Sequence, residues 1–282
     1  MNSEKGYSIH LLCDIMKMNR SSYYKWLARP KSKLERENEE LVGMIQVLYA
    51  KYNGIFGYRR MTMYINRGPE NPYNHKRIHR LMGIMGLKSV IRKKRPSYVK
   101  STPQITAENV LNRDFAANGI NEKWLTDVTE FKYGSQKAYL SAILDLKDRR
   151  IVSYVIGHSN NNQLVFETFD QAILDNPGAT PLFHSDRGFQ YTSKVFKTKL
   201  DEAKMAQSMS RVNRCIDNGP IEGFWGILKA EMYYLRKFQS FVELKAAIED
   251  YIYFYNYERL QAKLGSRAPY EYHDHLLAKQ AS

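Results

Sequence analysis

The second half of the chain has an order of strands and helices that few folds accommodate. Three segments rich in β-branched and aromatic residues follow one another with only tight turns between them, and helices then alternate with shorter strands. Strands are expected at 123–132, 138–146, 151–157, 181–185 and 207–210, and helices at 161–174, 193–203, 220–235 and 241–257, with a polar loop at 211–219. Three strands in succession predict an antiparallel meander, and the whole order predicts an α/β domain whose last helix is 241–257.

The first hundred residues indicate helices instead. Helices are expected as a pair within 7–27, singly at 33–49, and as a second pair within 54–87. Ser21 and Ser22 offer a cap to the second helix of the first pair, and Asn74 offers one in the second pair. Both pairs therefore have the outline of a helix-turn-helix, which small helical pairs of other kinds also share.

The positive charge of the chain is concentrated in the same region. The net charge is +14, and residues 1–100 alone hold 21 Lys or Arg against 7 Asp or Glu, so the remaining residues are neutral overall. A concentrated basic surface is typical of a segment that binds a polyanion. A basic surface that only keeps the chain soluble would give the same count.

A basic run separates the two halves. Arg92, Lys93, Lys94 and Arg95 precede Pro96 and predict a basic tether. The domains expected are a helical segment at 1–50, a basic helical region with a helix-turn-helix outline, typical of DNA-binding proteins, at 51–100, a linker at 101–118, and the α/β domain with a C-terminal helical extension at 119–282.

Several classes of protein and of site are disfavoured. No run approaches the roughly 18 to 20 apolar residues that cross a bilayer, and the start lacks a signal-peptide pattern, so we expect a cytoplasmic protein. Cys13 and Cys215 belong to no C-x-x-C pair, which argues against a disulfide framework or a cysteine zinc site. His75 and His79 have a zinc-site spacing, but no Cys, Asp or Glu nearby completes the shell.

Three acidic residues stand out by context among the 29 in the chain. Asp127 lies within an expected core strand, where an uncompensated charge is costly. Asp186 ends a strand, and Glu222 lies in the first turn of a helix that begins near Pro220. Each one alone could be an ordinary solvated acid. Together they suit divalent cations, because cleavage of a phosphodiester by two metal ions needs converging carboxylate ligands.

The spacing and the flanking motifs carry a family resemblance. Thirty-five residues separate Asp186 from Glu222, and Lys229 follows Glu222 by seven residues, on the same helix face. The flanking motifs are Trp124–Thr129, His184–Gly188 with Gln190 and Tyr191, Asp217 with Asn218, and Tyr255 and Asn256 with Arg259, Leu264 and Pro269. This set resembles bacterial insertion-sequence transposases of the DDE and retroviral integrase-like superfamily, in particular the second-reading-frame product of copy-out elements.

The resemblance implies a fold and a site. The fold would be the RNase H-like catalytic core of retroviral integrases, with a mixed five-stranded sheet, preceded by small all-α helix-turn-helix domains. Asp127, Asp186 and Glu222 would be catalytic and would hold two Mg²⁺ ions, which Mn²⁺ could replace. DNA contacts would come from Lys229, Arg187, Gln190, Tyr191 and Asn218 near the acids, and from Arg59, Arg60, Lys76, Arg77, Arg80 and the run Arg92–Arg95 in the basic third. For Tyr191 and Asn218, packing and capping are equally good explanations.

The implied function is that of a DNA transposase, a polynucleotidyl transferase that cleaves and joins strands at the ends of an insertion sequence. Its partners would be double-stranded DNA, further copies of the chain, and a first-reading-frame protein or fusion, with no membrane, and it would be associated with the nucleoid. An RNase H-like nuclease that cuts without joining, and a non-catalytic DNA-binding regulator, remain alternatives. Retroviral integrases carry a His-His-Cys-Cys zinc module, which this chain cannot build because Cys13 is the one cysteine of its N-terminal region.

Overall fold

Contacts divide the chain into two units, residues 1–89 and 90–282. The structure is a computed structural model, and it describes residues 8–68, 72–91, 109–112, 114–211 and 215–280. The helices of the described residues include none that is both long enough and apolar enough to span a membrane.

The described part of the first unit is helical, as the sequence predicts. Its helices are α2 (Ile9–Ile15), α3 (Arg20–Ala28), α4 (Lys33–Lys51), α5 (Tyr58–Ile65) and α6 (His75–Ile84). Leu41, Ile45, Met61 and Ile78 are fully buried where α4, α5 and α6 pack together. Helices α5 and α6 thus form a helix-turn-helix pair, and α4 packs against both of them.

The caps of these helices correct one expectation. Asn19, and not Ser21 or Ser22, caps α3, because its Oδ1 accepts the Ser21 backbone N–H at 2.8 Å while both serines already lie inside the helix. Asn74 caps α6 as predicted, and its Oδ1 accepts the Lys76 backbone N–H at 2.8 Å.

The second unit contains the predicted mixed five-stranded sheet. Its strands are β1 (Lys123–Tyr133), β2 (Gln136–Asp145), β3 (Ile151–Gly157), β4 (Leu182–Ser185) and β5 (Gln207–Met209), in the order β3-β2-β1-β4-β5. β1, β2 and β3 form the antiparallel meander, β4 pairs with β1 in parallel, and β5 pairs with β4 in parallel. The tight turn between β2 and β3 forms around Asp145, whose side chain accepts the Lys147 and Asp148 backbone N–H groups.

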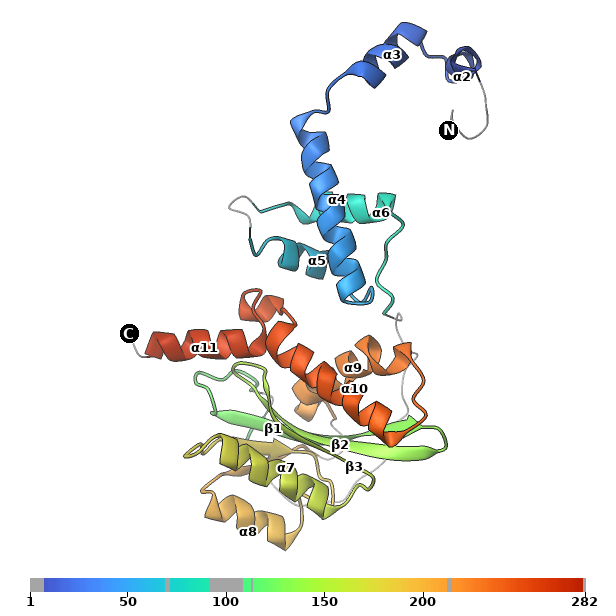
Figure 1. The fold of residues 1–282 in the computed structure, drawn as a ribbon. Coiled ribbons are helices and arrows are strands. Elements are labelled where there is room, and N and C mark those ends of the chain that lie inside the picture. Colours follow the sequence, from blue (N-terminus) through green and yellow to red (C-terminus); the bar gives the residue numbers. More distant parts are fainter. Residues whose placement is uncertain (1–7, 69–71, 92–108, 113, 212–214, 281–282) are drawn as a thin grey trace. The chain divides into compact units, whose positions relative to one another are not determined.

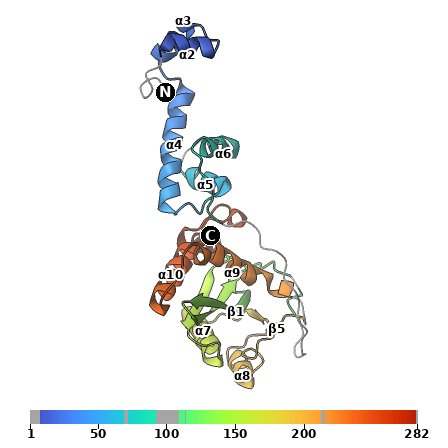
Figure 2. The ribbon, with the colours of Figure 1, turned by 90° about the vertical axis from the view of Figure 1, so that its right-hand side faces the viewer.

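Helices cover both faces of this sheet. α7 (Asn162–Asp175) and α8 (Lys194–Glu202) lie on one face, and α9 (Gly219–Glu231) and α10 (Phe241–Tyr253) lie on the other (Figures 1 and 2). Each interface has its own buried core. Phe169, Phe183 and Phe196 pack on the α7 side, and Leu140 packs with Phe224 on the α9 side. A sheet covered on both faces is buried, and β3 is accordingly apolar at all but Ser153 and Gly157.

The C-terminal segment differs from the sequence prediction. The helix expected to reach residue 235 ends at Glu231, and a separate short turn follows at Tyr233–Leu235. The helix expected at 241–257 is α-helical to Tyr253 and continues as a wider π-helical turn at Phe254–Glu258. It is not the last one, because α11 (Pro269–Gln280) follows.

Helix α11 escaped prediction because tertiary contacts, and not an apolar stripe, hold it in place. Pro269 is its one buried residue, so hydrophobic periodicity is weak. Its His273 Nδ1 lies 2.7 Å from Asp148 Oδ2, and its Tyr270 ring stacks on Tyr257 at 4.4 Å. The loop expected at 211–219 also contains more structure than predicted, since its described part includes a 3-10 helix at Cys215–Asn218.

Candidate active site

Asp127 and Asp186 occupy equivalent places on neighbouring strands. β1 and β4 pair in parallel with Thr126 opposite Ser185, and each acidic residue is the next one along its chain segment. β4 ends at Ser185, so Asp186 leaves the sheet at the carboxyl end of a strand, where the sites of α/β sheets assemble. The sheet itself therefore brings the two carboxylates to one edge.

Helix α9 brings Glu222 to the same edge. Asn218, just before the helix, donates from Nδ2 to the Thr126 carbonyl at 3.0 Å and so ties the start of α9 to the residue beside Asp127. Three residues beyond Glu222, on the same helix face, Trp225 Nε1 donates to Asp127 Oδ2 at 2.8 Å. Two hydrogen bonds, one just before the helix and one in its second turn, therefore fix α9 against β1.

The three carboxylates repel one another. Burial, and then the charge of Asp186, raise the pKa of Asp127 to about 7, although the hydrogen bond from Trp225 opposes this rise. Burial raises the pKa of Asp186 against the opposing bond from the Gly188 backbone N–H. Burial and the charge of Asp186 raise the pKa of Glu222. The negative charge gathered at this edge is therefore unfavourable in the protein alone.

The donor set fits a divalent cation. Within the described residues, none of the three carboxylates has a basic side chain as ion-pair partner, so the charge is uncompensated by the protein. Carboxylate oxygens are the ligands that Mg²⁺ takes in proteins, and a bound cation would reverse the rise in all three pKa values. In the part of the chain that the structure describes, no three Asp, Glu, His or Cys side chains are grouped closely enough to hold a metal ion by themselves. Water or DNA oxygens would therefore have to serve as further ligands beside these carboxylates.

Three residues of the predicted DNA-contact set are buried around the acids. The Tyr191 hydroxyl lies 3.2 Å from Thr126 Oγ1, and burial together with the charges of Asp127 and Asp186 raises the pKa of Tyr191. Gln190 donates to the Asn160 side chain, and Asn218 holds Thr126. Because these three side chains are buried, a role in holding the carboxylates in place is favoured. Their contact with DNA stays a prediction.

Arg187 and Lys229 are the cationic residues of that set nearest to the acids. Arg187 Nε donates to the Ser210 carbonyl at 2.7 Å, which ties the segment after β4 to the end of β5. Lys229 Nζ donates to Thr129 Oγ1 at 2.7 Å and lies over the Phe131 ring at 5.0 Å. Lys229 therefore stands beside the strand that carries Asp127, two helical turns from Glu222, as the sequence predicts.

His184 is excluded as a proton carrier. Its ring lies between Ser208 Oγ at 2.8 Å and Ser210 Oγ at 3.1 Å, and burial lowers its pKa to about 4. The ring is therefore neutral near pH 7. It joins β4 to β5 behind Asp186 and has a structural role.

Gly188 is required by a close approach. A Cβ added there would lie 2.8 Å from Gln190 Oε1 and 3.0 Å from Asp186 Oδ1. We expect Gly188→Ala to displace the Asp186 carboxylate and lower the rate of DNA cleavage by about 10- to 100-fold, since misplacement by about 1 Å can cost that much. Gly43→Ala is the control, because a Cβ at Gly43 meets no atom within 4 Å. Cleavage rates are measured for both variants, and thermal unfolding shows that each is folded at the assay temperature. A Gly188→Ala variant that cleaves as fast as the wild type would contradict the expectation.

Helix α6 of the first unit presents part of its predicted basic set. Lys76 and Arg80 are exposed. Arg77 is engaged within the unit, donating to Asn38 Oδ1 at 2.8 Å and to Glu37 Oε2 at 3.1 Å. Lys76 and Arg80 are therefore better placed than Arg77 to reach DNA.

Helix α5 and the tether hold the remainder of that set. Arg59 is exposed and donates to the Tyr58 hydroxyl at 3.1 Å, and Arg60 lies over the Phe56 ring at 5.5 Å. The predicted run Arg92, Lys93, Lys94 and Arg95 lies outside the described residues.

The sequence prediction missed Trp225, and it assigned no role to Thr126 and Thr129, although both lie in the Trp124–Thr129 motif. Trp225 holds Asp127, Thr126 joins β1 to Tyr191, and Thr129 holds Lys229. A signal for Trp225 was present, because an indole three residues beyond Glu222 shares its helix face and must find an acceptor when buried. The threonine contacts carry no such signal.

Comparison with known families finds the integrase core domain over residues 117–215 and again over residues 222–277, and an HTH-like domain over residues 35–95. Over 270 residues the chain is 38% identical to the putative transposase InsK for insertion sequence element IS150 of Escherichia coli K12, covering 94% of this chain and 93% of that protein. It is 42% identical over 200 residues to an uncharacterized transposase-like protein of Haemophilus influenzae, covering 71% and 92% of the two chains.

Solved structures include the HTLV-2 integrase catalytic core domain in complex with magnesium, which is 22% identical, covers 55% of this chain and 97% of that chain, and gives a TM-score of 0.44. The assignment rests on the sequence relatives and on the domain matches, whose order along the chain is that of the two units. Because the identity to an insertion-sequence transposase extends over nearly the whole of both proteins, the chain belongs to the insertion-sequence transposases that carry an integrase core domain.

Proposed function

We propose that the chain cleaves DNA at the ends of an insertion sequence and joins those ends to other DNA, with Asp127, Asp186 and Glu222 as its catalytic carboxylates. One observation carries the proposal. Three acidic side chains from β1, the end of β4 and α9 share one edge of the sheet, the charge of Asp186 raises the pKa of the other two, and no described basic side chain pairs with them. Such a cluster is unfavourable unless a cation binds to it.

The chemistry consists of two in-line displacements at phosphorus. In cleavage, the oxygen of water forms a bond to the scissile phosphorus, the bond from phosphorus to the 3′ oxygen breaks, and a proton goes to that 3′ oxygen. In joining, the freed 3′-hydroxyl attacks another phosphodiester, loses its proton and displaces a second 3′ oxygen. Asp127, Asp186 and Glu222 would hold two Mg²⁺ ions, or Mn²⁺, which supply the positive charge that stabilises the attacking and leaving oxygens.

The protein contributes a fixed geometry to both steps. Trp225 holds one oxygen of Asp127, and the Gly188 N–H holds one oxygen of Asp186. Lys229, beside Thr129, would bind a phosphate of the same DNA strand. Neither a covalent intermediate nor a nucleotide cofactor is needed.

The direct test is an assay of cleavage and joining on a duplex that carries the terminal repeat flanking this reading frame, with Mg²⁺ or Mn²⁺. We expect Asp186→Asn to remove both activities, because an amide cannot replace the anionic ligand. Asp170→Asn is the matched control, since Asp170 is an exposed acid on α7 that pairs with Lys199 at 2.7 Å. Undiminished activity of Asp186→Asn would sink the assignment, cleavage without joining would indicate a nuclease, and neither activity in the wild type would favour a regulator.

The helical unit would supply much of the affinity for DNA. Each Lys or Arg that neutralises a phosphate makes log K fall by about 0.9 per unit of log salt concentration. We therefore expect Lys76→Gln with Arg80→Gln to lower that slope by about 2, measured by binding to duplex DNA across a salt series. Arg77→Gln should leave the slope near that of the wild type and instead destabilise the unit by about 1 to 2 kcal/mol. The reverse pattern would mean that Arg77 faces DNA.

The assembly would contain more than one chain. Two element ends must be brought together, so we propose a dimer or a higher assembly on DNA in the nucleoid, with a first-reading-frame protein as a further partner. The predicted domain boundaries near residues 50, 100 and 118 can be tested by limited proteolysis. The boundary near residue 50 should be checked first, because α4, which ends there, packs on α5 and α6 beyond it.

A further inference from the structure

A basic hollow of about 450 Å³ lies in the second unit, beyond the end of α9. It is lined by the loop between α9 and α10 and by the end of the β1–β2 hairpin, which run side by side (Figure 1). Its lining includes the cationic side chains Lys132, Arg236 and Lys237 and the aromatic side chains Tyr233, Tyr234 and Phe238. A second hollow of about 400 Å³ adjoins it across Gly134 and Gln239.

The walls of the hollow are fixed by hydrogen bonds to β1. The Tyr233 hydroxyl donates to the Lys132 carbonyl at 2.9 Å and accepts the Lys132 backbone N–H at 2.9 Å. These bonds occupy the side of β1 that β4 leaves open, since β4 pairs with β1 only as far as Thr126. The Gly134 backbone N–H also donates to the Phe238 carbonyl at 3.0 Å. The hollow is therefore part of the fold, and its shape does not depend on a ligand.

The three cations of the hollow are available to a ligand. Lys132, Arg236 and Lys237 are exposed and form no ion pair within the described residues. The two acids nearby are already engaged: Glu130 pairs with Lys137 at 2.9 Å, and Glu243 accepts the Gln239 backbone N–H at 3.0 Å. Lys132 lies in the field of Glu130, whose pKa it helps to lower, so Arg236 and Lys237 are the cations that favour an anionic partner most.

An unbroken series of contacts joins the hollow to the carboxylates. Trp225 holds Asp127, Lys229 holds Thr129 and lies over Phe131, and the Phe131 and Tyr233 rings meet at 5.1 Å. The series follows β1 from Asp127 to Lys132 and α9 from Glu222 to its end. At about 3.3 Å per strand residue, the hollow lies roughly 17 Å from the acids, which is the rise of about five nucleotides of duplex.

We propose that this hollow binds the sugar-phosphate backbone of the element-end DNA, about five nucleotides from the phosphate held at the carboxylates. The inference rests on the proposed function, because that function places the scissile phosphate at Asp127, Asp186 and Glu222. Arg236 and Lys237 bind phosphate oxygens, and Tyr234, 42% exposed at the rim, packs on the sugars. Contacts of this kind set the register of the duplex and do not read its sequence.

The test uses the full chain and a terminal-repeat duplex in which one phosphate at a time is replaced by an uncharged methylphosphonate. In the wild type, neutralising the phosphate that contacts the hollow should weaken binding by about three- to tenfold and lower the salt slope by about 1. In the double variant Arg236→Gln and Lys237→Gln, the same replacement should have no further effect, while replacements elsewhere keep theirs. The control with an equal change of charge is Lys194→Gln with Lys204→Gln, two exposed lysines in and just after α8, on the opposite face of the sheet.

Each outcome decides the inference. A phosphate is called masked here when its neutralisation weakens binding by the wild type but not by the variant. A masked phosphate about five nucleotides from the cleavage point supports the inference. It is overturned if no phosphate is masked, if the masked one lies at the cleavage point itself, or if the control masks the same one. Since the scan measures binding alone, a wild type that binds but does not cleave would sink the proposed function only. The inference would then be decided by whether the phosphate masked in the double variant is separate from the one masked in Lys229→Gln.

Discussion

Replacing Asp127 by Asn is expected to abolish strand cleavage and at the same time to make the fold more stable above pH 7. The activity is lost because the amide cannot serve as an anionic metal ligand. If the transition state loses several kcal/mol of stabilisation of its negative charge, the rate falls by at least about 1,000-fold. The same change removes a repulsive charge from a site where Asp186 and Glu222 remain.

The sign of the stability effect follows from the pKa. Asp127 has a pKa of about 7 in the folded chain against an ordinary value of 3.8, so the folded chain binds a proton more tightly than the unfolded chain does. The stability of the wild type therefore falls as the pH rises from about 4 to about 7, by up to about 4 kcal/mol for this one group. Asn at this position keeps an acceptor for Trp225 Nε1 and carries no such penalty.

Thermal unfolding in metal-free buffer between pH 5 and pH 8 measures this effect. The midpoint of the variant should exceed that of the wild type at pH 8, and the difference should shrink towards pH 5. Addition of Mg²⁺ or Mn²⁺ should raise the midpoint of the wild type and leave that of the variant nearly unchanged, because binding to the folded state is what stabilises it. A variant that is less stable than the wild type at pH 8 would show that Asp127 is held by a favourable interaction and is not a destabilised ligand.

The sheet could be predicted from the sequence because its determinants are local. Strand β3 was predicted with its observed bounds, since β-branched and aromatic residues lie between a charged turn and a glycine. The three acids could be nominated because strand position and a fixed spacing select them. Trp225 could not be assigned to Asp127 in the same way, because the bond joins residues 98 positions apart and depends on how α9 packs on the sheet.

The C-terminal extension shows the other limit of sequence reasoning. Asn256 replaces a neighbouring strand at the edge of the sheet, where its side chain accepts the Ile151 backbone N–H at 2.9 Å and donates to the Ile151 carbonyl at 3.0 Å. The motif marked Asn256 and Arg259 as residues of interest, but not their partners, since those lie 105 and 28 positions away along the chain. Both residues brace the fold, and neither belongs to the carboxylate site.

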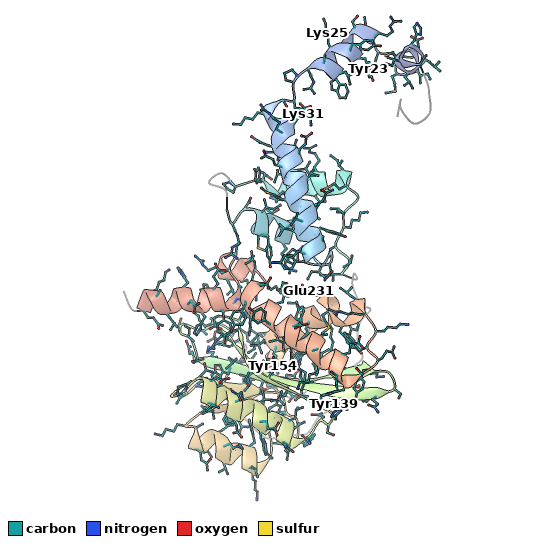
Figure 3. The ribbon with its side chains drawn as sticks, in the orientation of Figure 1. Tyr23, Lys25, Lys31, Tyr139, Tyr154 and Glu231 are labelled. Carbon is teal, nitrogen blue, oxygen red and sulfur yellow. The ribbon has the colours of Figure 1, made fainter. Side chains whose placement is uncertain are left out.

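The brace at Arg259 allows stability and catalysis to be separated. Arg259 donates to Glu231 at 2.9 and 2.7 Å, and the Tyr251 hydroxyl of α10 donates to the same carboxylate at 2.9 Å. Glu231 is the last residue of α9 (Figure 3). Glu231 is 7% exposed and Arg259 is 5% exposed, and the carboxylate raises the pKa of Arg259, which therefore stays charged. The pair is thus buried and bidentate.

We expect Arg259→Met to destabilise the fold by about 3 to 5 kcal/mol, because it leaves the Glu231 carboxylate buried without its guanidinium. Adding Glu231→Gln should restore at least half of the loss, since the amide still accepts from Tyr251 and no longer carries a charge. Lys263→Met, at an exposed position of the same segment, is the control and should change stability by less than about 0.5 kcal/mol. Denaturant unfolding measures all three, and a double variant no more stable than the single one would show that lost packing, and not the unpaired charge, causes the damage. Glu231 lies nine residues beyond Glu222 on α9. The double variant should therefore still cleave DNA at a temperature where it is folded, because the Arg259–Glu231 pair supports the fold and takes no part in the reaction.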